Sequence, residues 1–147
     1  MEKIQSFTVD HTKILPGMYI SRVDGDVTTY DLRFCRPNKE ILDGAAMHTI
    51  EHLFATYIRN TKLDVLYFGP MGCLTGFYLL IRNAVHLEVW KEIQTVLDHI
   101  SRFEGEIFGS TEVECGNYRY HNLDGAKMAA KTFRAVLEKE PVLYYPE

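Results

Sequence analysis

Alternating apolar and polar positions predict several strands along this chain. In the run TTYDLRFC, Thr28 to Cys35, the apolar side chains fall on one face, and the charged side chains of Asp31 and Arg33 fall on the other. This alternation is typical of a half-buried strand. The run from Leu74 to Ile81 is apolar on both faces, so we expect a central strand there. The remaining predicted strands cover 62–68 and short stretches near 7–9, 18–23 and 113–115.

Helical spacing of apolar residues predicts three helices, over Ala45 to Arg59, over Ala84 to Phe103, and from Asn122 to a stop at Pro141. Asp43 stands where the N-cap of the first helix is expected. Five or six strands and three helices, out of strict alternation, favour the α+β class, with a mostly antiparallel sheet packed against the helices. A length of 147 residues fits one domain, 1–147.

The first predicted helix contains the stretch HTIEH, which has the spacing of a metal site. His48 and His52 lie about 40° apart around the helix axis and one turn along it, and Glu51 lies about 60° to the other side of His48. Two imidazoles on one helix face can bind one metal ion. Small neighbours such as Ala45 and Thr49 leave room beside them, so we expect this face to border a cleft or an interface.

Two other interpretations of HTIEH stay open at this point. An amphipathic helix with two surface histidines shows the same pattern. The stretch also matches the H-x-x-E-H motif of zinc peptidases, in which the glutamate, here Glu51, is the general base.

The three cysteines differ in their surroundings. Cys115 precedes Gly116 at an expected strand end and is a candidate third ligand, because two histidines and a cysteine with an open position form a catalytic metal pattern. Cys73 follows a turn, GPMG, where its thiol can point into a cleft and act as a thiolate near a cation. For each of these two, a packed core thiol is the alternative. Cys35 follows a strand of core residues, and we interpret it as part of the core.

Composition excludes several classes of protein. A net charge of −4 and the lack of any Lys/Arg run argue against a nucleic-acid binder with a broad basic surface. No apolar run approaches the roughly 20 residues that span a bilayer, so we expect no membrane partner. The first residues lack the pattern of a secretion signal. An odd number of unevenly spaced cysteines indicates a reducing, cytoplasmic setting.

The chain resembles S-ribosylhomocysteine lyases, the LuxS family, nearly from end to end. Five ordered blocks carry the resemblance, and together they are more specific than any one of them. The blocks are SFTVDH (6–11), YDLRFCRPNKE (30–40), HTIEHLFATYIRN (48–60), PMGCLTGFYL (70–79) and ECGNYRYHNLDGAK (114–127).

The resemblance implies that the chain cleaves the thioether of S-ribosylhomocysteine. The expected products are homocysteine and 4,5-dihydroxy-2,3-pentanedione, the precursor of autoinducer-2. The implied route is a non-redox, metal-assisted migration of the carbonyl along the ribose, followed by β-elimination. His48, His52 and Cys115 would hold one divalent ion. In this family that ion is natively Fe²⁺, and Zn²⁺ is often found in its place.

The resemblance also implies roles for five further residues. Glu51 and Cys73 would form the general acid–base pair, and Ser6, His11 and Arg33 would bind or orient the substrate. Taken without the resemblance, Arg33 could equally form a surface salt bridge with Asp31 or a neighbour, or steady the Cys73 thiolate or substrate oxygens. The family is homodimeric, with its active sites at the subunit interface, so we expect a second copy of this chain as a partner.

One segment departs from the family pattern. Many members have an acidic residue and Ile-Ser just before PMGC, whereas Tyr67 and Phe68 stand in the corresponding stretch LYFGPMGC. The acidic residue is associated with the amino group of the homocysteine moiety. Tyr67 offers a hydroxyl without a charge, so we expect the contact to this amino group to differ here.

Overall fold

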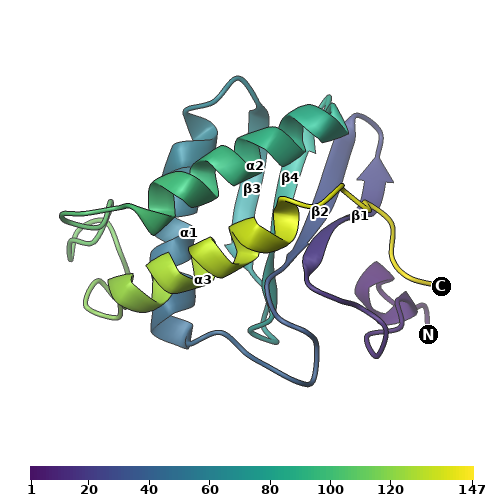
Figure 1. Ribbon diagram of the computed structural model, residues 1–147, viewed down its shortest axis with the longest axis horizontal. Coiled ribbons are helices and arrows are strands. Elements are labelled where there is room, and N and C mark those ends of the chain that lie inside the picture. The colour runs from purple at the N-terminus through teal and green to yellow at the C-terminus, as the bar shows by residue number, and fades with distance from the viewer.

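Four strands form one sheet in the computed structural model, which describes residues 1–147 (Figure 1). The sheet order is β1-β2-β4-β3, and every neighbouring pair is antiparallel. β2 and β4 are central, which confirms the expectation for the apolar run near residue 74. The strands are β1 (Gly17–Asp24), β2 (Val27–Arg33), β3 (Asp64–Pro70) and β4 (Gly76–Arg82).

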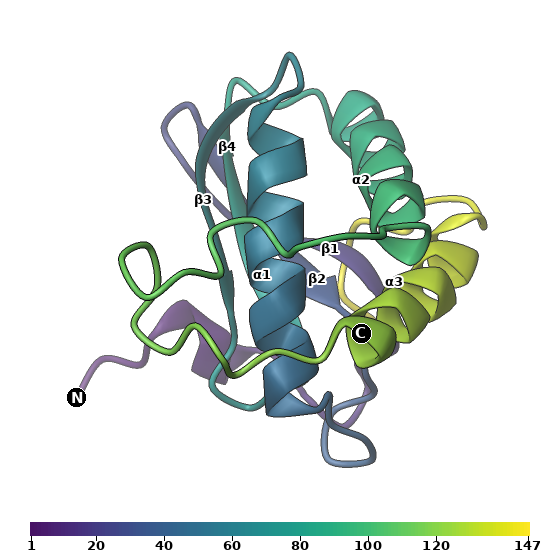
Figure 2. The ribbon, with the colours of Figure 1, turned by 90° about the vertical axis from the view of Figure 1, so that its left-hand side faces the viewer.

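Three α-helices lie together beside one face of the sheet (Figure 2). They are α1 (Gly44–Arg59), α2 (His86–Ser101) and α3 (Leu123–Leu137), and a short 3₁₀ helix, η1 (Gln5–Thr8), precedes the sheet. The α+β class with a mostly antiparallel sheet and three helices is therefore confirmed. None of these helices combines the length and the apolar character needed to cross a bilayer.

The caps that begin α1 and α3 come from residues that the sequence singles out. The side chain of Asp43 accepts a hydrogen bond from the Ala46 N–H at 3.1 Å. The side chain of Asn122 accepts one from the Gly125 N–H at 2.9 Å. Each bond satisfies one of the free N–H groups of a first helical turn, which stabilises a helix by about 1 kcal/mol.

Aromatic side chains join α1 to the sheet. The rings of Phe54 and Phe68 stack with centroids 4.1 Å apart, and Phe68 stacks in turn on Phe77 at 4.8 Å. Burying each such ring contributes about 1.5–3 kcal/mol relative to leaving it in water. The apolar face of α1 is thereby fixed against β3 and β4, and its histidine face is directed away from this core.

Two of the predicted strands are wrong, and the sheet has four strands where five or six were expected. The stretch 7–9 begins with the end of η1, where the Phe7 N–H donates to the Ile4 carbonyl at 3.0 Å and Phe7 is 69% exposed. The stretch 113–115 lies in a turn, with Val113 97% exposed. Apolar side chains in both stretches lack a neighbouring strand, and local turn hydrogen bonds replace the ladder.

The connection 102–122 between α2 and α3 contains no regular helix or strand. It passes over α1, as the green segment of Figure 2 shows. Connections of this length are uncommon in small domains and are often functional.

Gly76 is expected to be required for the pairing of β2 with β4. A Cβ atom at this position would lie 2.3 Å from the Leu32 carbonyl oxygen and 3.1 Å from the Arg33 Cα. Gly76→Ala should lower the free energy of unfolding by about 2 kcal/mol or more, because neither backbone strand can move aside cheaply. Urea unfolding measures this change.

Gly72→Ala is the matched control, because nothing lies within 4 Å of a Cβ atom there. Its free energy of unfolding should stay within about 0.5 kcal/mol of the parent protein. Equal stability of the two variants would mean that the strands tolerate the extra methyl group.

Candidate active site

The two histidines of α1 are fixed by backbone carbonyls of the 102–122 connection. The Nδ1 atom of His48 lies 2.6 Å from the Tyr120 carbonyl oxygen, and that of His52 lies 2.7 Å from the Phe108 carbonyl oxygen. A carbonyl oxygen only accepts, so each Nδ1 carries the hydrogen and donates it. A ring held in this tautomer presents the bare lone pair of its Nε2 when it is neutral, which is the form that binds a metal ion.

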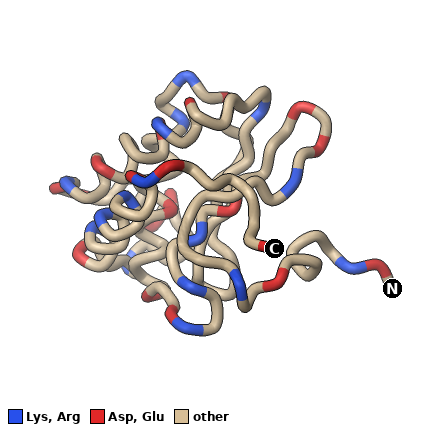
Figure 3. Tube along the Cα trace, turned by 45° about the vertical axis from the view of Figure 1, so that its right-hand side comes forward, with Lys and Arg blue, Asp and Glu red and all other residues tan.

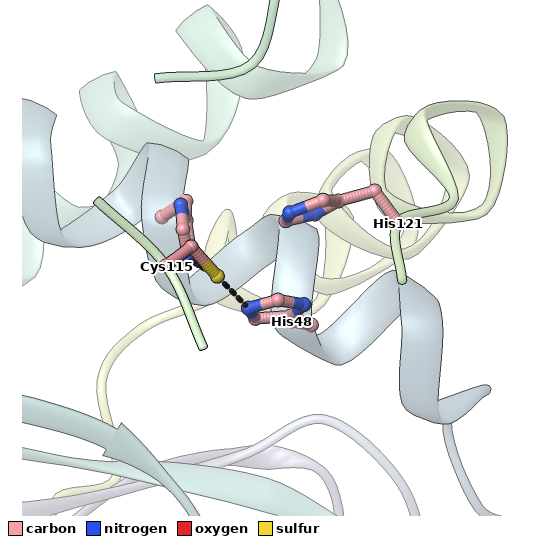
Figure 4. Close-up of side chains that lie close together, drawn as sticks. His48, Cys115 and His121 are labelled. Atoms are coloured by element: carbon pink, nitrogen blue, oxygen red, sulfur yellow. Dashed lines mark hydrogen bonds between the residues drawn. The ribbon is translucent and has the colours of Figure 1, made fainter. Parts of the chain in front are cut away.

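The sulfur of Cys115 lies beside both Nε2 atoms. Its Sγ is 3.4 Å from the Nε2 of His48 and 3.7 Å from that of His52 (Figure 4). Typical zinc–nitrogen and zinc–sulfur bonds in a tetrahedral site would set these atoms roughly 3.5 Å apart. The three atoms therefore have the separations of a shared metal ion, and the donor set fits Fe²⁺ or Zn²⁺.

A turn delivers Cys115 to the histidines. The Cys115 N–H donates to the Thr111 carbonyl oxygen at 3.0 Å, so the thiol projects from a turn and the predicted strand end is absent. The neighbouring Gly116 and an expected strand end made Cys115 a candidate ligand, and its local structure was wrongly predicted.

His121 joins this cluster, and the sequence analysis missed it. One of its ring nitrogens lies within 4.8 Å of the ligand atoms of His48, His52 and Cys115. Its Nδ1 lies 3.0 Å from the hydroxyl of Thr49, and its Nε2 is buried without a hydrogen-bond partner. Burial, together with the neighbouring imidazoles of His48 and His52, lowers the pKa of His121 to about 4, so the ring is neutral near pH 7.

The ring of His121 is stacked on that of His48 and therefore is less well oriented for the same ion than His52 is. The two rings stack with centroids 4.1 Å apart and planes 15° apart, one above the other (Figure 4). A ligand nitrogen directs its lone pair in the plane of its ring, so an ion in the His48 plane lies well outside the His121 plane. His48 and His52, in contrast, are nearly perpendicular, at 88°. The four side chains thus form a His/Cys cluster that could hold one metal ion.

Thr49 is not part of an open cleft, contrary to the expectation for the small residues of α1. Its side chain is buried and its hydroxyl contacts the His121 ring at 3.0 Å and accepts from the Asn122 N–H at 3.0 Å. The hydroxyl therefore fixes the start of α3 and the position of the His121 ring against α1.

Cys73 lies in the turn between β3 and β4 and lines a cavity of about 490 Å³. Ser6, His11 and Arg33 line the same cavity, so the three predicted substrate residues and the predicted thiol are brought together. The next residue, Leu74, has a φ of 65°, a backbone region that costs energy for a residue with a side chain. Such strain is common at functional turns.

Arg33 and Asp31 form a buried ion pair, where the sequence suggested a surface one. They are 2% and 0% exposed, and two nitrogens of Arg33 donate to the two carboxylate oxygens at 2.6 and 3.1 Å. Burial acts to lower the pKa of Arg33, but the hydrogen bonds and charge of Asp31 outweigh it and raise that pKa. The third guanidinium nitrogen donates to the Thr75 hydroxyl at 2.9 Å and lies 4.0 Å from the Cys73 sulfur.

Glu51 stands apart from this cavity. Its side chain is half-buried on α1, one residue before His52, and it does not line the cavity of Cys73. None of the metal-cluster residues lines that cavity either. One chain therefore holds the predicted site residues in two groups, one on α1 and the connection 102–122, the other around Cys73.

Tyr67, at the departure from the family pattern, is 52% exposed on β3. It lines a hollow next to the Cys73 cavity, and Ser6 borders both. The hydroxyphenyl group thus faces solvent at the rim of the substrate residues.

Comparison with known proteins gives consistent matches over the full chain. The family model described as S-Ribosylhomocysteinase (LuxS) matches residues 4–142. An S-ribosylhomocysteine lyase of Desulfotalea psychrophila is 48% identical, over 99% of both chains. Those of Borreliella burgdorferi and Finegoldia magna are each 44% identical, over 99% and 100% of this chain and all of theirs. The chain therefore belongs to the S-ribosylhomocysteinase (LuxS) family.

Proposed function

We propose that this protein is an S-ribosylhomocysteine lyase, a carbon–sulfur lyase that releases homocysteine and 4,5-dihydroxy-2,3-pentanedione, the precursor of autoinducer-2. One observation carries the proposal. Two Nε2 atoms lie 3.4 and 3.7 Å from one sulfur, on a chain of this family. A peptidase of the H-x-x-E-H type would use a distant glutamate where this chain offers Cys115.

The proposed reaction moves the ribose carbonyl until it is two bonds from the carbon that carries sulfur. A divalent ion held by His48, His52 and Cys115, native Fe²⁺ or Zn²⁺ in its place, would act as a Lewis acid on the sugar oxygens. Each shift removes a proton from a carbon beside the carbonyl and returns one to the neighbouring carbon, so nothing is oxidised overall. Two protein groups serve this better than one, because the protons leave and return at different carbons.

Cys73 and Glu51 are the proposed acid–base pair. The thiolate of Cys73 takes a proton beside the carbonyl, and the carboxyl of Glu51 exchanges a proton with the sugar. In the last step a base removes a proton from the carbon that lies between the carbonyl carbon and the carbon bonded to sulfur. The electrons of that C–H bond form a double bond, and the C–S electrons leave with homocysteine sulfur, which is then protonated. Ser6, His11 and Arg33, which share the cavity of Cys73, would orient the substrate.

We also propose that two copies assemble into a homodimer with the active sites at the interface. The two separate groups of site residues in one chain support this arrangement, because a partner could supply the group that each lacks. Apolar residues are also exposed beside the Cys73 cavity, namely Ile4, Phe7 and Tyr67. Burial of such side chains stabilises an interface.

A small-molecule substrate and a cytoplasmic setting complete the proposal. Lys and Arg residues are interspersed with Asp and Glu residues along the chain, and neither sign gathers over a broad region (Figure 3). Nucleic-acid binders rely on a broad basic surface. The three cysteines are free, as a reducing compartment would keep them.

Cys115→Ala should abolish tight metal binding, because it removes one of three ligands. Titration with Co²⁺ and detection of the thiolate-to-cobalt absorption measures this loss. Cys35→Ala is the matched control, since Cys35 is a buried core thiol, and it should keep the absorption. Equal cobalt spectra for the two variants would exclude the sulfur of Cys115 from the site.

Cys73→Ala and Glu51→Gln should keep the bound metal and lose turnover by a factor of about 10² or more, as expected when a general acid or base is removed. The assay is release of homocysteine thiol from S-ribosylhomocysteine by iron- or cobalt-loaded protein. No thiol release by the loaded parent protein would contradict the proposed function, and full activity of either variant would remove that residue from the mechanism.

Mixed dimers test the shared site. Cys73→Ala and Cys115→Ala should each be inactive, and an equimolar mixture refolded together should recover about one quarter of the parent activity if each site uses both chains. In that mixture half of the dimers are mixed, and each has one intact site. A monomeric mass in solution, or no recovery on mixing, would contradict the interface arrangement.

A further inference from the structure

The last residues of the chain reach the face of the sheet that the helices leave uncovered. The Leu143 carbonyl accepts from the Ile20 N–H at 2.7 Å, and Leu143 forms a parallel bridge with Tyr19 on the edge strand β1. The ring of Tyr145 then stacks on that of Tyr19, with centroids 5.0 Å apart and planes 20° apart. Figure 1 shows this terminal segment, in yellow, beside β1.

Tyr145 begins a continuous series of hydrogen bonds that leads to Cys73. Its hydroxyl donates to the Asp31 carboxylate at 2.7 Å, and the same carboxylate accepts from Arg33 at 2.6 Å. Arg33 donates onward to the Thr75 hydroxyl at 2.9 Å. That hydroxyl lies 3.0 Å from the Cys73 sulfur.

The chemistry of the carboxylate and the guanidinium fixes the direction of the series as far as Thr75. A carboxylate only accepts and a guanidinium only donates, so the Thr75 oxygen accepts from Arg33, and its hydrogen can be donated to the sulfur when Cys73 is a thiolate. A thiolate accepts such a hydrogen bond better than a thiol does. The series therefore ends in a donor that favours the thiolate of Cys73, and the charge of Arg33, 4.0 Å from the sulfur, acts in the same sense.

Tyr145 is the second donor to one carboxylate oxygen of Asp31. Asp31 is fully buried, and its Oδ2 atom accepts hydrogen bonds from Arg33 and from the hydroxyl of Tyr145. Without that hydroxyl, Arg33 would be the one remaining donor to Oδ2. Burial and the charge of Asp31 raise the pKa of Tyr145, so the phenol keeps the hydrogen that it donates. Leu143 adopts a φ of 63°, a conformation that its bond to Ile20 maintains.

We propose that Tyr145 is a positioning residue that holds Asp31 and Arg33 so that Thr75 and Arg33 favour the thiolate of Cys73. This inference rests on the proposed role of Cys73 in the lyase reaction. Tyr145 lies beyond residues 4–142, which the family model matches.

Tyr145→Phe tests the proposal, because it keeps the ring on Tyr19 and removes the hydroxyl. The measurement is the alkylation rate of Cys73 with iodoacetamide as a function of pH, followed on the Cys73 peptide by mass spectrometry. The rate near pH 7 should fall about three- to tenfold and its midpoint should move to higher pH, because the thiolate loses support. The variant keeps the other titratable side chains that line the cavity, which are His11, Arg33 and Tyr78.

Tyr144→Phe is the matched control, since Tyr144 is 68% exposed, and its alkylation profile should overlay that of the parent. A chain that ends at Leu143 should show the same shift as Tyr145→Phe. In the lyase assay, Tyr145→Phe should lower kcat by a similar factor and leave KM within about twofold.

Overlay of the Tyr145→Phe and parent alkylation profiles would overturn the proposal, even if the melting temperature of the variant falls, because a purely structural contact would lower stability alone. Failure of the lyase function is distinguishable from this result. A parent protein without lyase activity would still give the alkylation profiles, and these decide the role of Tyr145 by themselves.

Discussion

The imidazoles of His48 and His52 are each held at Nδ1 by a backbone carbonyl of the connection 102–122, and the rest of the site depends on these two contacts. They select the tautomer, set the ring orientation and direct both Nε2 atoms to one point. The same connection supplies Cys115 at that point. A segment without regular structure is thus held in place at the site, because its carbonyls accept hydrogen bonds from side chains of α1, and α1 is itself fixed by core packing.

Local patterns were sufficient to predict α1. The period of its apolar residues, the cap at Asp43 and the histidine spacing are all properties of one short stretch, and each has a local physical cause. The same methods failed for 7–9 and 113–115, where apolar residues suggested strands. Such a stretch forms a strand only if another strand lies beside it to share hydrogen bonds. The whole fold, and not the local sequence, determines whether such a strand is there.

His121 and Asp31 show a different limit of sequence reasoning. His121 contacts Thr49 across 72 positions of the chain, and no spacing rule indicates that its ring packs over His48. Alternation along β2 correctly put Asp31 on the face opposite the core residues, but it predicted that this face would be exposed to solvent. The tail, whose Tyr145 lies 114 positions away, bonds to Asp31 on that face, and the pair is buried. A buried pair of this kind is costly to separate, so its partners constrain each other.

A bound ion would have a mechanical consequence for the folded chain. His48 and Cys115 are 67 positions apart, so an ion that both bind closes that length of chain, including β3, β4 and α2, into a loop. An ion that binds the folded site and not the unfolded chain stabilises the fold by its binding free energy, about 2.7 kcal/mol when the free ion is at 100 times its Kd. Loading of the metal and resistance to unfolding are therefore linked: a cell that withholds the cofactor would weaken the scaffold along with the chemistry.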